Sequence, residues 1–184
     1  MADVIAAAQA RPGALTYASA GPGSTQHLTA ELLKLQTGTD ILHIPYKGSA
    51  PALTALMSGE VDMVFINVPA ILQHVKSGRL RPLAAAGAKR SELMPEVPTL
   101  KEAGVKVDVA LWYGVLAPAG TPKEIVQLLN AATAKAARSP DIRQKLLDQG
   151  AEPVGNTAEE FAAMLREEVP KWTEVIRASG IKPE

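Results

Sequence analysis

The 184-residue sequence contains no cysteine, and no apolar run approaches the roughly 20 residues that a helix needs to cross a bilayer. The absence of cysteine excludes disulfides and thiolate metal sites, but it is compatible with either the cytoplasm or the periplasm. The chain also lacks a net charge, because 19 Lys and Arg residues balance 19 Asp and Glu residues. We therefore expect neither a nucleic acid nor an anionic membrane surface as a partner.

Sequence motifs for metals, nucleotides and secretion are missing as well. The three histidines, His27, His43 and His74, have no spacing that places two metal ligands on one helical turn, so we predict no metal site. The segment GPGSTQH lacks both the P-loop pattern and G-x-G-x-x-G, and no cofactor is predicted. The amino-terminal MADVIAAAQARPG has Asp3 where a secretory signal carries basic residues, so it does not read as a signal peptide.

The first half of the chain alternates short apolar runs with helical patterns that end at glycine. The predicted strands span residues 14–19, 41–45, 61–66 and 80–86. The predicted helices span residues 2–11, 25–37, 49–58 and 69–77. This alternation indicates a parallel sheet covered by helices on both faces.

Near residues 105–115 the pattern changes, and the remainder of the chain is mostly helical. Helices are predicted at 122–138 and 140–149, and a last amphipathic helix is capped by Thr157, with Glu160 completing a capping box. The other elements predicted in this half are a short helix at 99–103, an apolar strand at 109–118 that holds Trp112 and Tyr113, and a strand at 151–154.

The first candidate binding element is the glycine-rich turn between the strand at 14–19 and the helix at 25–37. Gly23, Ser24 and Thr25 precede or open that helix, whose free backbone N–H groups and partial positive charge suit a carboxylate or another anion. Simple capping by Ser24 or Thr25 explains the same residues. His27 lies in the first helical turn, where it either faces the ligand or bonds a neighbouring loop.

A second turn repeats the arrangement after the next strand, at Tyr46, Lys47, Gly48 and Ser49. Gly48 permits a close backbone approach and Lys47 offers a positive charge, although Tyr46 packing and a solvated Lys47 are the simpler interpretations. Asn67 follows the third strand and either contacts the ligand or caps the next helix. Turns at the carboxyl ends of parallel strands converge on one cleft, where open α/β sheets bind ligands.

Several segments together resemble the substrate-binding proteins of tripartite tricarboxylate transporters, the Bug-type family. The segments that carry the likeness are YASAGPGSTQHLTAELL, HIPYKGSAPALTALMSGEVDMVF, AAAGAKRSELMPEVPTLKEAG, WYGVLAPAGTP and GAEPVGNTAEEFAAMLREEVPKW. The resemblance implies a periplasmic α/β protein of the type II periplasmic-binding class, in which two lobes clamp a small organic acid. It further implies capture of di- or tricarboxylates without catalysis, for delivery to the transporter's membrane subunits.

The resemblance also predicts how the chain is organised. Residues 1–110 correspond to the second, ligand-binding lobe, with a parallel-rich sheet flanked by helices. Residues 111–184 correspond to the crossing strand and the C-terminal helices of an incomplete first lobe. We expect an N-terminally truncated protein that binds its ligand weakly and, because edges and apolar faces are left bare, forms a homo-oligomer.

Two other functions remain open as alternatives. An α/β hydrolase-like enzyme would use Ser24 as its nucleophile with His27 or His43, but no G-x-S-x-G elbow surrounds Ser24. The effector-sensing domain of a transcription regulator shares the two-lobed design, but the sequence shows no helix-turn-helix segment.

Overall fold

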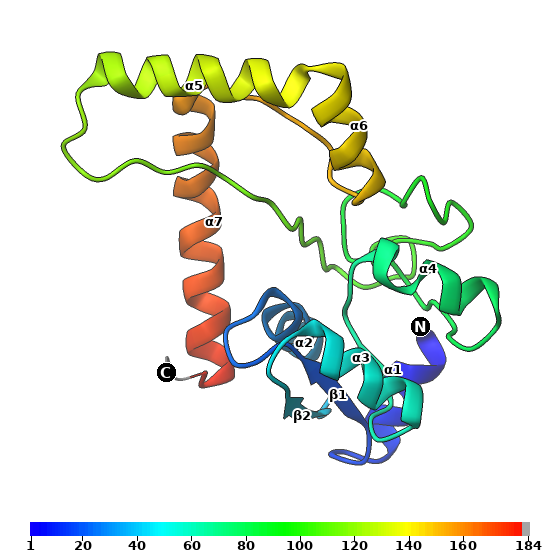
Figure 1. Ribbon diagram of the computed structural model, residues 1–184. Coiled ribbons are helices and arrows are strands. Elements are labelled where there is room, and N and C mark those ends of the chain that lie inside the picture. The colour runs from blue at the N-terminus through cyan, green and yellow to red at the C-terminus, as the bar shows by residue number, and fades with distance from the viewer. Residues whose placement is uncertain (182–184) are drawn as a thin grey trace. The chain divides into compact units, whose positions relative to one another are not determined.

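The computed structural model describes residues 1–181, which divide into two compact units (Figure 1). The first unit contains residues 1–111 and the end of the chain from Trp172 onward, and the second contains residues 112–171. No helix among residues 1–181 combines the length and the apolar character needed to span a bilayer.

A three-stranded parallel sheet organises the first unit. Its strands are β1 (Thr16–Ser19), β2 (Leu42–Pro45) and β3 (Met63–Val64), in the spatial order β2-β1-β3. The helices that connect them are α2 (Thr25–Thr37) and α3 (Ser49–Ser58). The predicted α/β architecture with a parallel sheet is therefore confirmed, and β1 lies at its centre.

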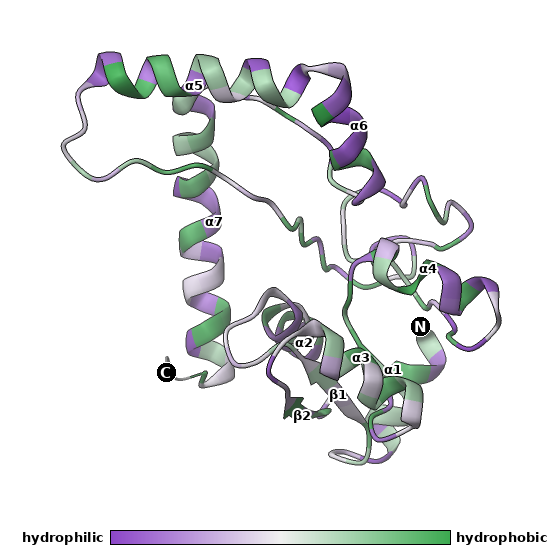
Figure 2. Cartoon of the chain, in the orientation of Figure 1, coloured by the Kyte–Doolittle hydropathy of each residue, from purple (hydrophilic) through white to green (hydrophobic). Residues whose placement is uncertain are grey.

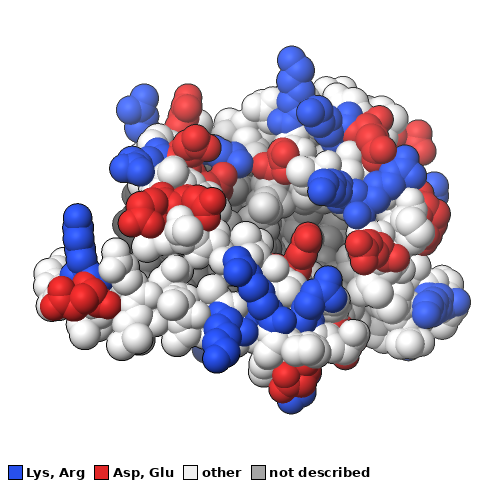
Figure 3. All heavy atoms as spheres, turned by 90° about the horizontal axis from the view of Figure 1, so that it is seen from above, with Lys and Arg blue, Asp and Glu red and all other residues white. Residues whose placement is uncertain are grey.

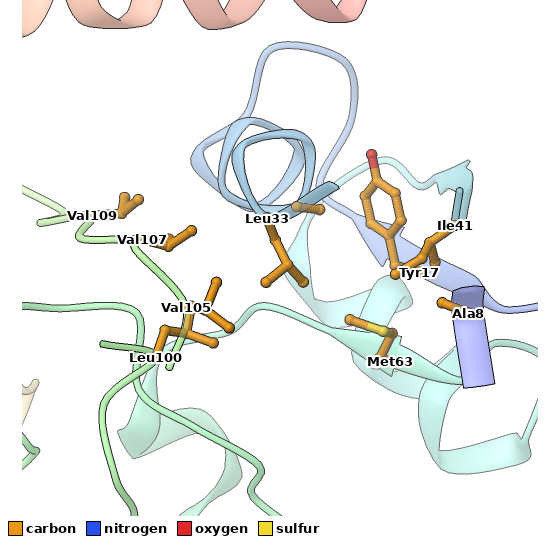
Figure 4. Packing of buried hydrophobic residues seen from close by; sticks show 10 residues of the cluster. Ala8, Tyr17, Leu33, Ile41, Met63, Leu100, Val105, Val107 and Val109 are labelled. Atoms are coloured by element: carbon orange, nitrogen blue, oxygen red, sulfur yellow. The ribbon is translucent and has the colours of Figure 1, made fainter. Parts of the chain in front are cut away.

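Alternating side chains of β1 enter two separate hydrophobic clusters, as the period of two in a strand requires. Tyr17 belongs to the larger cluster, together with Leu33 of α2, Ala8 of α1 (Ala2–Ala10) and Val105 (Figure 4). The next residue, Ala18, faces the opposite side and packs in a cluster with Ala52 and Ala55 of α3. Helices therefore cover both faces of the sheet.

Glycine ends α2 and α3 as the sequence predicts. Gly38 follows α2 with φ 62°, and Gly59 follows α3 with φ 77°. Both angles lie in the left-handed region, which side chains with a Cβ rarely adopt, so glycine suits these helix ends. Helix α4 (Val68–Lys76) closes this part of the chain.

Two elements predicted between residues 80 and 103 do not form. The strand predicted at 80–86 is reduced to one parallel bridge between Ala85 and Thr99, and the helix predicted at 99–103 is a turn. Pro82 has no N–H to donate to a ladder, and Gly104 ends the turn before a second helical turn can form. The turn still has a capping box, in which Thr99 and Glu102 each accept a hydrogen bond from the other's backbone N–H, at 3.1 and 2.7 Å.

Helices dominate the second unit, which contains α5 (Lys123–Arg138), α6 (Pro140–Asp148) and the start of α7 (Ala158–Ser179). Hydrophobic and hydrophilic residues alternate along α5 and α7 (Figure 2). The predicted capping box at the start of α7 is confirmed, because Thr157 and Glu160 exchange hydrogen bonds of 2.8 and 3.1 Å. From Trp172 onward α7 belongs to the first unit, whose larger cluster Trp172 contacts.

The strands predicted at 109–118 and 151–154 are wrong, since neither segment forms a ladder within the described chain. A strand needs the backbone of a neighbour. In residues 109–118, within the described chain, the backbone bonds are one from Val109 N–H to the Ala86 carbonyl and one turn bond from Thr121 N–H to the Pro118 carbonyl, which together make no ladder. Side chains hold this segment instead. The Trp112 and Phe161 rings pack edge to face with 5.4 Å between their centroids, and Gly114 leaves room for the Phe161 ring.

Replacing Leu33 with alanine should destabilise the first unit strongly. Its side chain is 1% exposed within the larger cluster, so truncation leaves a cavity and should lower the free energy of unfolding by about 2–5 kcal/mol. Leu35 of the same helix is 45% exposed and provides the matched control, Leu35→Ala, for which little change is expected. Urea denaturation measures both, and equal losses would contradict the assigned packing.

Candidate functional site

The carboxyl ends of the three parallel strands meet at one edge of the sheet, and each is followed by a loop and a helix start. The loops after β1 and β2 are in contact. Tyr46 N–H donates to the Ser19 carbonyl at 3.0 Å, and a Cβ placed on Gly21 would lie 3.5 Å from the Tyr46 carbonyl oxygen. The strand order thus brings the two predicted glycine turns together, with β1 between β2 and β3.

The first helix start is ordered by the predicted cap, Ser24. Its hydroxyl accepts from His27 N–H at 3.3 Å and donates to the Gly21 carbonyl at 2.7 Å. Within residues 1–181 the N–H groups of Thr25 and Gln26 have no acceptor, as helix geometry predicts for a first turn. Two backbone donors therefore remain at the amino end of α2, where the helix dipole favours an anion.

The second helix start differs because a glycine caps it. Gly48 adopts φ 111°, a conformation suited to glycine, and makes no side-chain cap. Pro51 has no N–H, so the donors at this end come from Ser49 and Ala50. Gln26 Nε2 donates to Ser49 Oγ at 3.1 Å, so a hydrogen bond links the two helix starts directly.

The two other residues predicted in this turn differ, because Tyr46 packs against the core and Lys47 is exposed. The Tyr46 ring packs against the cluster formed by Ala18 and Ala52, which matches the packing interpretation. The Lys47 side chain is exposed. On the face shown in Figure 3, positive and negative groups are interspersed. Among the residues predicted for the two turns, Lys47 is the one that carries a positive side chain.

Asn67 is the N-cap residue of α4 and is exposed, but its side chain makes no capping hydrogen bond. Of its two predicted roles, capping is therefore not observed, and ligand contact stays a prediction. Asp62 lies at the opposite end of β3, where its carboxylate accepts from both Thr16 N–H and Thr16 Oγ1 at 2.8 Å. This bond holds the starts of β1 and β3 together, far from the glycine turns along the strands.

His27 is buried, and its contact is with the loop. Its Nδ1 accepts a hydrogen bond from Gly23 N–H at 3.1 Å, and its ring stacks on His43 with 3.9 Å between centroids. The His43 ring in turn stacks on Tyr17 at 4.8 Å, and His43 Nε2 lies 2.6 Å from Ser19 Oγ. Of the two roles predicted for His27, the bond to a neighbouring loop is the one observed here.

Sequence reasoning missed the contribution of His43 to this loop. Tyr17 pairs with His43 in the β1–β2 register, which places both rings on the same face of the sheet. The sequence does place Tyr17 and Ser19 two residues apart in one predicted strand, so that both face the same side of the sheet, and it places His43 in the next predicted strand. Only the register between the strands turns that placement into a contact.

A buried charge lies below the stacked rings. Glu31 accepts hydrogen bonds from Tyr17 Oη at 2.7 Å and from Lys34 Nζ at 2.8 Å. Burial disfavours the Glu31 carboxylate, but the bonds from Lys34 and Tyr17 outweigh it and lower its pKa. Burial, followed by the bond to Glu31, raises the pKa of Tyr17.

The geometry gives no support to a nucleophilic Ser24. Its hydroxyl is bonded to backbone groups, and the imidazole of His27 is bonded to Gly23 instead. The serine that does contact an imidazole is Ser19, which is fully buried beneath the loop. Within residues 1–181 no group of three His, Asp or Glu side chains is placed to hold a metal ion.

A parallel sheet with glycine turns at the carboxyl ends of its strands has the architecture of open α/β folds, which bind ligands at that edge. Residues 1–181 match the family model of the tripartite tricarboxylate transporter family receptor, TctC, and the chain belongs to this family. The Bug-type resemblance inferred from the motifs is thereby confirmed. The family consists of solute-binding proteins of the periplasmic-binding fold.

Individual relatives support the same assignment. The chain is 41% identical to Protein BugT of Bordetella pertussis over 180 residues, which cover 97% of this chain and 55% of BugT. Among solved structures it is similar to R. palustris Rpa4515 with adipate, with a TM-score of 0.85 and 40% identity over 100% of this chain and 62% of that one. It is also similar to MatC from Rhodopseudomonas palustris with bound malate, with a TM-score of 0.80 and 30% identity over 96% of this chain and 61% of MatC.

The cap of α2 can be tested by its contribution to stability. Ser24→Ala removes the hydroxyl that accepts from His27 N–H, and the expected loss is about 1 kcal/mol of unfolding free energy. Ser24→Asp retains a capping oxygen but loses the hydrogen bond that Ser24 donates to the Gly21 carbonyl, so its stability should lie between those of the wild type and Ser24→Ala. Thermal unfolding followed by circular dichroism compares the three proteins, and an unchanged midpoint for Ser24→Ala would contradict the cap.

Proposed function

We propose that this chain forms part of an extracytoplasmic solute-binding protein that captures small carboxylates for a tripartite tricarboxylate-type transporter, without catalysing a reaction. The observation that carries this proposal is the pair of linked helix starts. Gln26 bonds Ser49 across them, and the N–H groups of Thr25, Gln26, Ser49 and Ala50 face the same edge of the sheet. Two such ends side by side suit a negatively charged group better than a neutral one.

The proposed ligand contacts follow from this arrangement. The N–H groups of Thr25, Gln26, Ser49 and Ala50 surround one carboxylate. Gly23, Ser24 and Gly48 form the turns around it, since the Gly23 and Ser24 N–H groups are already bonded to His27 Nδ1 and the Gly21 carbonyl. The Ser49 hydroxyl and the exposed Lys47 and Asn67 side chains complete the polar contacts. The Ser24 hydroxyl holds the helix start through its cap, while Tyr46 and His27 shape the site from below. The solved structures of Rpa4515 with adipate and of MatC with bound malate support a small dicarboxylate as the ligand.

In the whole protein, we place residues 1–110 in the second lobe of a two-lobed periplasmic receptor. We place residues 111–184 in the crossing segment and C-terminal helices associated with the first lobe. The border between the two compact units near residue 111 supports this proposal, although residues 172–181 at the end of α7 belong to the first unit. Closure of two lobes on the acid would create the form that the transporter's membrane subunits bind.

Calorimetric titration with adipate and malate tests the proposal, with the neutral diamide of adipic acid as the ligand control. We expect weak saturable binding of at least one diacid, with a Kd between roughly 10 μM and 1 mM, and none of the diamide. Ser24→Asp keeps the helix cap but places a carboxylate among the donors, so it should abolish binding through charge repulsion.

The matched control is Thr157→Asp, the same chemical change at the N-cap of α7 in the second unit. It should bind the diacid like the wild type. Equal affinity for the diamide, or undiminished diacid binding by Ser24→Asp, would exclude the two helix starts as a carboxylate site.

We also propose that the chain self-associates, and that the exposed apolar stretch at 111–116 contributes to the contact. Tyr113, Val115 and Leu116 are 80%, 71% and 71% exposed, and such surfaces tend to be covered by a partner. Light scattering coupled to gel filtration should give a mass of at least two chains. Leu116→Glu should lower that mass while Leu35→Glu, at an exposed site on α2, leaves it unchanged; a monomer at all concentrations would refute self-association.

A further inference from the structure

Two imidazoles, one buried and one half-buried, lie beneath the glycine-rich loop that connects β1 to α2. His27 comes from the first turn of α2 and His43 from β2, and their rings are 3.9 Å apart and inclined by 15°. Each imidazole uses a nitrogen to bond one end of the loop. We infer that the pair is a positioning device, which holds the loop in its donor-presenting conformation while both rings are neutral and releases it when His27 is protonated.

At the far end of the loop the bond is to the main chain. His27 Nδ1 accepts from Gly23 N–H at 3.1 Å, so Nδ1 carries no proton and the neutral ring has its hydrogen on Nε2. Protonation of Nδ1 would leave its new N–H facing the Gly23 N–H, and two donors cannot form a hydrogen bond with each other. The Gly23 bond therefore cannot survive in the imidazolium form.

At the near end the bond passes through a serine. His43 Nε2 lies 2.6 Å from Ser19 Oγ, and the same oxygen accepts from Gly21 N–H at 3.1 Å. Ser19 is fully buried, so this chain of contacts is shielded from water. Together the two histidines determine where Gly21 and Gly23 lie, and hence how α2 begins.

The surroundings of the two rings, taken together, favour their neutral forms at pH 7. Burial lowers the pKa of His27, and burial together with the neighbouring His27 lowers the pKa of His43 to about 4. The Glu31 carboxylate opposes this shift and Lys34 adds to it, while the Tyr17 hydroxyl stays protonated. Because both histidines have a lower pKa in the folded protein, their contribution to stability is complete above pH 6.5 and is lost as the pH falls toward 4.

Nitrogen-15 NMR of the histidine rings, with the Gly23 amide observed in the same protein, tests the inference without any ligand. We expect His27 to show the Nε2–H tautomer at pH 7. On acidification the Gly23 amide resonance should shift with the same midpoint as the His27 ring, below pH 6.5. A Gly23 amide that does not respond while His27 titrates would overturn the inference.

Two substitutions separate positioning from packing. His27→Asn retains an acceptor near the position of Nδ1 and should keep the Gly23 amide protected from hydrogen exchange, but without the acid-induced shift. His27→Leu fills similar space without an acceptor, so Gly23 exchange should accelerate roughly tenfold. His74→Leu on α4 is the matched control and should change neither observation; if His27→Leu does not fold, the wild-type titration and His27→Asn decide.

The consequence for ligand binding rests on the proposed function, and a separate measurement tests it. Adipate affinity measured at pH 7 should fall roughly tenfold in His27→Leu and be retained in His27→Asn. If Gly23 responds as expected but the wild type binds no diacid, the proposed function fails and the positioning of the loop stands. If adipate binds equally to the wild type and His27→Leu, the loop bond has no role in binding and this part of the inference is wrong.

Discussion

The central strand β1 pairs with β2 on one side and β3 on the other, and the first unit is built around this double pairing. The register places Tyr17 between His43 and Met63 on one face, while Ala18 packs toward α3 on the other. Since the strands are parallel, their carboxyl ends also share one edge. The hydrophobic clusters and the two glycine turns are thus consequences of a single arrangement.

Polar groups beneath the turns connect that core to the candidate site. The sequence of contacts runs from the buried Glu31 through Tyr17 and the stacked imidazoles to the backbone of the loop. Glu31, Tyr17, His27 and His43 each make a side-chain hydrogen bond in it, and bonded buried groups make a structure more specific. Hydrogen bonds therefore hold the loop at the edge of the sheet more rigidly than its glycine content would suggest.

The second unit is organised by different forces. Its helices are amphipathic, and the segment before α5 is held by Trp112 against Phe161 without any ladder of backbone bonds. Gly114 is needed for this contact, because a Cβ at that position would clash with the Phe161 ring. The long helix α7 belongs partly to each unit, so secondary structure and domain division do not coincide.

Local chemistry in the sequence was sufficient for helices α1 to α7 and for the type of sheet. Ser24, Thr157 and the glycines after α2 and α3 mark helix ends through contacts within a few residues, so their effect is visible without the fold. The first three strands follow from apolar runs between those signals. The motifs that carry the family resemblance likewise lie in continuous segments.

Strand pairing and the interior of the site were decided only by tertiary structure. The apolar run at 109–118 has the composition of a strand, but a ladder requires a neighbour at the right distance and the described chain supplies none. Similarly, His43 is one of three isolated histidines in the sequence and becomes a support for Ser19 only through its register with Tyr17. Which residues distant in sequence become hydrogen-bond partners depends on how the chain packs, and a local sequence pattern does not contain that information.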